Sequence, residues 1–227
     1  MLPDGTAVVE AAQAIPLDPE RLDVRSASSR GLGLLILAVG APRALVVGLG
    51  GTANMDAGAG LLEVVDSLPA RTRVACDVQT RLVDAPRLFG PQKGATPELI
   101  HELEARFRGH PFGEVAGSGA AGGLGAAFAS LGAELVPGAE LVLELTGFDP
   151  SGYDLVVTGE GTVDETTWEG KAPAAVRRAC ARAGIDCVLF GGRVYGGDAV
   201  PLSGRPDRAY DDLVTLGMQL GRGLATR

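Results

Sequence analysis

Short apolar runs alternate with amphipathic stretches along this chain, and glycine-rich turns separate them. The apolar runs are typical of buried strands and cover residues 6–10, 44–47, 73–78, 140–145, 153–158 and 186–190. Stretches with apolar side chains at helical spacing, or with helix-start signals, cover residues 28–39, 58–65, 96–107, 172–183 and 208–220, and an alanine-rich helix follows Gly125. Strands that alternate with helices through short turns predict an α/β protein with parallel sheets.

Two of the glycine-rich turns follow apolar runs directly and carry carboxylates. The first spans residues 48–56 and ends at Asp56, and the second spans 158–164 and contains Glu160 and Asp164. A third acid, Asp77, belongs to the end of the run at 73–78. Taken singly, an aspartate in such a place is most often a turn or cap residue. Several acids at the carboxyl ends of separate strands favour a shared site for an anionic ligand or a metal–phosphate group.

Composition narrows the classes of function. The 227 residues carry a formal net charge of −8, which argues against nucleic-acid binding. Glycine is in excess, at 34 residues, and the three cysteines form no C-x-x-C pair. The sequence shows neither a membrane-spanning run nor a basic segment followed by an apolar one, so a cytoplasmic protein with no membrane partner is the expectation.

Other motifs carry less information. Gly117–Gly122 matches G-x-G-x-x-G, yet no clear strand precedes it, so close helix packing or a ligand loop at Gly119 and Gly122 is favoured over a dinucleotide site. Neither a P-loop nor a G-x-S-x-G motif occurs. Lys93 and Lys171 lie in or beside loops, where an ammonium group suits a phosphate contact, although a lone lysine is usually a solvated charge.

Four segments in register resemble bacterial type I glycerate kinases: residues 48–60, 89–96, 117–126 and 158–173. The resemblance covers nearly the whole chain and is weakest after Val194. It implies ATP- and Mg²⁺-dependent transfer of a phosphoryl group to D-glycerate, commonly giving 2-phosphoglycerate, in a cleft between two α/β domains. It also implies that residues 1–147 form an inserted three-layer domain and residues 148–227 the C-terminal part of a flavodoxin-like domain.

The chain also departs from the family pattern. Nothing in it corresponds to the first strands of the family, and their absence would expose a sheet edge beside Val156, which favours self-association. Met55 stands where the family has asparagine, Thr162 where it has arginine, and Glu165 where it has glycine. The loop at residues 79–87 is shorter than in the family and lacks glycine.

The resemblance and the residue types together suggest roles. We expect Asp164 or Asp77 to orient the glycerate hydroxyl as the base, and Asp56 and Glu160 to lie near Mg²⁺ or the substrate. Lys93 and Lys171 are expected to contact phosphate or the glycerate carboxylate. Close backbone approach to the ligand is expected at Gly50, Gly51, Gly119 and Gly122, and Thr52 is expected to bind the substrate or nucleotide.

Three hypotheses remain open at this point: an active glycerate kinase, a truncated relative that binds glycerate or nucleotide without turnover, and a kinase for another small hydroxy acid.

Overall fold

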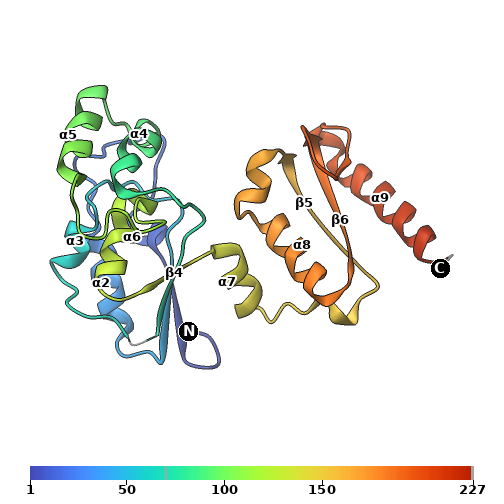
Figure 1. Cartoon of the computed structure of the whole chain (residues 1–227), viewed down its shortest axis with the longest axis horizontal. Coiled ribbons are helices and arrows are strands. Elements are labelled where there is room, and N and C mark those ends of the chain that lie inside the picture. Colours follow the sequence, from blue (N-terminus) through green and yellow to red (C-terminus); the bar gives the residue numbers. More distant parts are fainter. Residues whose placement is uncertain (70, 226–227) are drawn as a thin grey trace. The chain divides into compact units, whose positions relative to one another are not determined.

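The chain folds into two compact units, Met1–Gly138 and Ala139–Arg227 (Figure 1). The structure is a computed structural model that describes residues 1–69 and 71–225. Each unit contains a parallel sheet, so the predicted α/β class is confirmed. The boundary expected near residue 147 lies beyond the observed division, and almost all of the helix over residues 138–145 belongs to the second unit.

The first unit is built on a four-stranded parallel sheet in the order β1-β2-β3-β4. Its strands are β1 (Thr6–Glu10), β2 (Ala44–Gly48), β3 (Thr72–Ala75) and β4 (Glu134–Val136). The central strands are apolar because both of their faces are covered, and Leu45, Val47 and Val74 are at most 1% exposed. In this arrangement the carboxyl ends of β2 and β3 lie next to each other, where the glycine-rich turn begins.

Within residues 1–69 and 71–138, six α-helices accompany this sheet: α1 (Ala11–Ala14), α2 (Arg30–Val39), α3 (Ala59–Leu62), α4 (Ala85–Phe89), α5 (Pro97–Phe107) and α6 (Ala120–Ser130). The main core packs Leu32 of α2, Leu61 of α3 and Phe128 of α6 against the strands. Helix α5 begins as its sequence predicts, because the Thr96 side chain accepts a hydrogen bond from the Leu99 N–H and a proline opens the first turn.

The second unit contains a three-stranded parallel sheet in the order β5-β6-β7. Its elements are α7 (Gly138–Leu145), β5 (Leu155–Val163), α8 (Ala172–Ala183), β6 (Asp186–Val194), β7 (Val200–Pro201) and α9 (Ala209–Leu224). Strand β5 forms one edge of this sheet, and α8 packs against β5 and β6. None of the helices in the described part of the chain is long and apolar enough to cross a membrane.

Residues 140–145 form most of helix α7, so the strand predicted there is wrong. Apolar and polar residues nearly alternate in this run, which is typical of a strand. Leu141 and Leu145 are nevertheless four residues apart, as on one face of a helix, and Leu141 is buried. Strand β4, a short strand that was not predicted from the sequence, forms one edge of the first sheet.

The second glycine-rich segment, expected as a turn, is instead the last part of β5. Strand β6 likewise runs through Gly191 and Gly192 to Val194. Glycine is needed inside β5 because Gly159 is paired with Phe190, and a Cβ on Gly159 would lie 2.6 Å from that ring. These glycines therefore allow close strand contacts rather than a chain reversal.

Candidate active site

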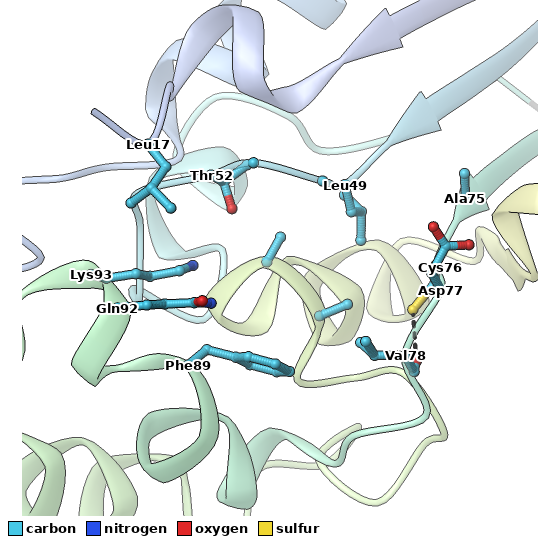
Figure 2. A pocket seen from close by; sticks show the side chains of 14 residues that line it. Leu17, Leu49, Thr52, Ala75, Cys76, Asp77, Val78, Phe89, Gln92 and Lys93 are labelled. Carbon is cyan, nitrogen blue, oxygen red and sulfur yellow. Dashed lines mark hydrogen bonds between the residues drawn. The ribbon is translucent and has the colours of Figure 1, made fainter. Parts of the chain in front are cut away.

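A hollow of about 230 Å³ opens in the first unit, at the carboxyl ends of β2 and β3 (Figure 2). Crevices at this edge of a parallel sheet are where α/β proteins commonly bind ligands. The hollow brings together five of the predicted site residues: Gly50, Gly51, Thr52, Asp77 and Lys93.

The loop after β2 offers backbone donors to this hollow. Gly51 has a left-handed backbone (φ 70°), and its carbonyl accepts a hydrogen bond from the Leu17 N–H at 2.9 Å, which fixes the loop. The backbone N–H groups of Gly50, Gly51 and Thr52 donate to no acceptor in the described part of the chain. Successive free N–H groups of this kind are suited to an anion.

The Thr52 side chain is 3% exposed, and its hydroxyl has no hydrogen-bond partner among the described residues. Figure 2 shows this hydroxyl pointing into the hollow. A buried polar atom without a partner destabilises a fold by about 1–3 kcal/mol. Such an atom facing a cavity indicates a partner that a ligand supplies.

Lys93 provides a buried positive charge to the same region. It ends the short helix η2 (Pro91–Lys93), is 4% exposed, and donates a hydrogen bond from Nζ to the Asn54 carbonyl at 2.8 Å. Burial lowers the pKa of Lys93 from 10.5 to about 8, against the opposing effect of the Asp56 charge. The group is therefore still mainly protonated at neutral pH and can pair with an anion.

Asp77 lies on the other side of the hollow from Lys93 (Figure 2). One of its carboxylate oxygens, Oδ1, accepts a hydrogen bond from the Gly138 N–H at 2.9 Å. The side chain is exposed, and the other oxygen has no partner among residues 1–69 and 71–225. The hollow thus presents a cation and donors at one end and a free carboxylate oxygen at the other.

Asp56 does not line this hollow and lies beside a smaller one, next to Met55 and Arg106. Its carboxylate accepts five hydrogen bonds, from the Ser29 N–H and hydroxyl, the Asn54 amide, and the N–H groups of Gly58 and Gly60. Burial would raise the pKa of Asp56, but these hydrogen bonds outweigh it and lower the pKa. Asp56 therefore joins the start of α2 to the start of α3.

We expect Asp56→Asn to lower the free energy of unfolding by about 2 kcal/mol at neutral pH, because an amide cannot accept from all of these donors. Since the folded pKa is lowered, this contribution is present above the unfolded pKa and is lost as pH falls through the folded pKa. Urea unfolding of Asp56→Asn at neutral and acidic pH, with the exposed Asp66→Asn as control, measures the difference. Equal stability of the two variants at neutral pH would contradict this role.

Gly119 and Gly122 also lie outside the hollow. A Cβ on Gly119 would lie 2.5 Å from the Arg81 carbonyl oxygen, and a Cβ on Gly122 would lie 2.0 Å from the Asn54 carbonyl oxygen. Both glycines thus allow close backbone packing at the start of α6, the alternative weighed from the sequence.

Glu160, Asp164 and Lys171 form a cluster in the second unit. The Lys171 Nζ lies 3.5 Å from Glu160 Oε2 and 3.8 Å from Asp164 Oδ1. Asp164 caps the short helix η4 (Glu165–Glu169), where a hydrogen bond from the Thr166 hydroxyl is the main cause of its lowered pKa. The Thr167 hydroxyl in turn donates to Glu160 Oε1. These three residues therefore hold one another in place around the end of β5.

The fit of Mg²⁺ to the predicted ligands is poor. The oxygens of Asp56 are occupied by protein donors, and both oxygens of Glu160 face Thr167 or Lys171. No group of three or more His, Cys, Asp or Glu that could hold a metal occurs among the described residues. Metal binding by Asp56 and Glu160 stays a prediction.

The apolar walls of the hollow are not predictable from the sequence pattern; they come from Leu17, Leu49, Val78, Phe89, Ala120 and Ala121. Leu49, Phe89, Ala120 and Ala121 lie in segments that resemble the known family, but no residue pattern marked them as walls of a hollow. The neighbouring Cys76 thiol contacts the Val78 carbonyl oxygen at 3.0 Å, and burial raises its pKa. Cys76 is therefore an unreactive wall residue.

Comparison with known proteins shows clear relatives. The sequence profile of the Glycerate kinase family matches residues 1–67 and 64–205. The chain is 33% identical to a glycerate kinase of Bacillus subtilis (strain 168), over 86% of this chain and 65% of the relative. It is 35% identical to a glycerate 2-kinase of Escherichia coli (strain K12), over 76% of this chain and 60% of the relative.

A solved structure agrees with these matches. A crystal structure from Salmonella typhimurium LT2, which carries the provisional name glycerate kinase 2, superposes with a TM-score of 0.66 at 30% identity. The match covers 84% of this chain and 67% of that one. The chain spans slightly less than two thirds of the length of the first curated relatives it matches.

Proposed function

This chain belongs to the glycerate kinase family, and we propose that it carries out ATP-dependent phosphorylation of D-glycerate, giving 2-phosphoglycerate. The observation that carries the proposal is the buried, unpaired Thr52 hydroxyl, which faces the same hollow as the buried Lys93 ammonium group. Both groups suit the carboxylate of a small hydroxy acid.

The hollow matches the two ends of glycerate. A carboxylate at the Lys93 end would accept hydrogen bonds from the Thr52 hydroxyl and from the free N–H groups of Gly50 and Gly51. A glycerate hydroxyl at the other end would donate to the free oxygen of Asp77. Phosphoryl transfer depends mainly on positioning and charge, so holding this hydroxyl in place is the main task of the site.

Asp77 is our preferred base, because it lines the hollow and one of its oxygens is free. Asp164 remains the alternative, since it lies beside Lys171, a cation suited to a phosphate group. In both cases the carboxylate accepts the hydroxyl proton as the oxygen attacks the terminal phosphorus of ATP, the bond from that phosphorus to the bridging oxygen breaks, and ADP leaves. Proton acceptance of this kind typically contributes about 10²–10⁴-fold to the rate.

Thr52→Val tests the role of the orphan hydroxyl. Valine has the same shape, so we expect the unliganded protein to be as stable as the wild type or slightly more stable. D-glycerate affinity is expected to fall about tenfold, the loss of one hydrogen bond to a charged group. Calorimetric titration with D-glycerate and thermal melting measure the two effects.

Thr72→Val is the matched control, because Thr72 is also buried but donates to the Pro69 carbonyl at 2.8 Å. We expect Thr72→Val to lose stability by about 1 kcal/mol while glycerate affinity is kept. A Thr52→Val protein that is destabilised and binds glycerate normally would overturn the assignment.

A coupled assay of ADP release, with and without D-glycerate, tests the activity itself. Glycerate-dependent ADP release supports the kinase. Glycerate or ATP binding without ADP release favours a non-catalytic binding protein, a candidate motivated by Thr162, which stands where the family resemblance implies an arginine.

A further inference from the structure

A second hollow, of about 340 Å³, lies in the second unit at the carboxyl ends of β5 and β6. We infer that it binds the nucleotide, with the polyphosphate at Arg193 and the nucleoside against the apolar wall. This inference rests on the proposed function, which requires a nucleoside triphosphate as the phosphoryl donor. The first hollow would then hold the hydroxy acid.

Arg193 supplies the charge for the polyphosphate. It is paired in register with Thr162, and both residues line the hollow near the ends of their strands. Its guanidinium group is exposed and forms no ion pair with any described residue, whereas the neighbouring Arg205 is engaged by Asp207 at 2.6 Å. A free guanidinium at the edge of a cavity matches the geometry of phosphate oxygens.

The floor of this hollow is glycine. A Cβ on Gly161 would meet no atom within 4 Å, so the space beside it belongs to the cavity. Gly192 lies close to Gly161, because a Cβ added to Gly192 would be 2.7 Å from the Gly161 carbonyl oxygen. Bare backbone at the end of two parallel strands lets phosphate oxygens approach closely.

Apolar lining comes from Leu202, Pro206 and Ala209, and Asp212 also lines the hollow. Asp212 accepts hydrogen bonds from the Ser203 hydroxyl and N–H, and the hydroxyl contact is the main cause of its lowered pKa. The apolar side chains suit the base of a nucleoside, and the Asp212 carboxylate is an acceptor suited to sugar hydroxyls. The lining thus combines a free cation with apolar side chains and an acceptor, a set of groups that suits a nucleotide.

Two variants test the inference in the whole chain. Arg193→Gln removes the cation, and Gly161→Val fills the space at the floor without disturbing a left-handed backbone. Titration of each with ADP, inorganic tripolyphosphate and D-glycerate measures the effect. We expect both variants to bind ADP at least about tenfold more weakly, Arg193→Gln to lose tripolyphosphate affinity to the same extent, and D-glycerate affinity to be unchanged.

Arg182→Gln is the control, since Arg182 lies in the last turn of α8 and does not line the hollow. Thermal melting identifies any variant that does not fold, and Gly161→Ala then replaces Gly161→Val. Wild-type ADP affinity in folded Arg193→Gln and Gly161 variants, or no ADP binding by the wild type, overturns the inference. Loss of ADP affinity in a protein that never binds D-glycerate would support the inference and refute the proposed hydroxy-acid site.

Discussion

Replacing Lys93 by methionine is expected to weaken D-glycerate binding roughly 30- to 160-fold, because the charge-assisted hydrogen bond of a buried ammonium group contributes about 2–3 kcal/mol. Methionine preserves most of the side-chain volume, so the hollow keeps its shape. The Asn54 carbonyl, which accepts from Nζ at 2.8 Å, loses its partner. The variant therefore separates the charge from the packing of this side chain.

The stability of the wild type relative to Lys93→Met is expected to rise with pH. The Lys93 pKa is about 8 in the folded protein and 10.5 as the ordinary value. Between these values the unfolded chain binds more protons, so stability rises with pH; below about 8 the cost of burying the charge is fully present. Relative to Lys93→Met, the wild type should gain about 3 kcal/mol of stability across this interval, of which about 2 kcal/mol is gained by about pH 9.5.

Binding should change in the opposite direction, because the anion needs the protonated lysine. D-glycerate affinity of the wild type is expected to fall as pH rises through about 8, while Lys93→Met binds weakly at every pH. Urea unfolding and calorimetric titration of both proteins at about pH 7 and about pH 9.5, on either side of the folded pKa, measure the two trends. Glycerate affinity in the wild type that is flat over this range, or that Lys93→Met retains, would show that the ammonium group does not bind the acid.

Gly122→Ala is expected to destabilise the first unit by about 4 kcal/mol or to prevent its folding. Gly122 has a φ of 66°, and a Cβ there would lie 2.0 Å from the Asn54 carbonyl oxygen. Neither the backbone strain nor the clash can be relieved by a side-chain rotation, because the contact is to main chain. Thermal and urea unfolding measure the loss.

Gly132→Ala is a matched control for the backbone term. Gly132 also has a positive φ (80°), but a Cβ there would meet no atom within 4 Å. We expect this variant to lose only about 1 kcal/mol. Similar losses in the two variants would mean that the close approach at Gly122 is unimportant, and would make that residue a candidate for ligand contact again.

Much of the fold follows from local sequence. The runs at β1 and β2 are short, apolar and bounded by turn residues, and α5 carries its own cap at Thr96. Helix α7 was missed because six residues of mixed period carry too little information to separate a helix from a strand. The end of β5 was missed because Gly159, which packs against Phe190, gives the same signal in the sequence as a turn glycine. Only the pairing of β5 with β6 separates these two roles.

Site residues are predictable from the sequence only where they follow strands that are neighbours in the sheet. Thr52 and Asp77 follow adjacent parallel strands, so their meeting follows from the strand order. Asp56 joins two helix starts through hydrogen bonds from Ser29, which is 27 residues away in the chain, and no local sequence pattern predicts that partner. The missing partner of the Thr52 hydroxyl is likewise a property of the packed structure and not of the sequence.

The polar end and the apolar walls of the first hollow are built from different groups. Its polar end combines backbone N–H groups with the buried Thr52 and Lys93, whereas Leu17 and Phe89 on its walls come from separate segments. Trimming or enlarging these walls would therefore alter the length of acid that enters while anion recognition is kept. The hollow is a practical starting point for engineering a changed substrate range.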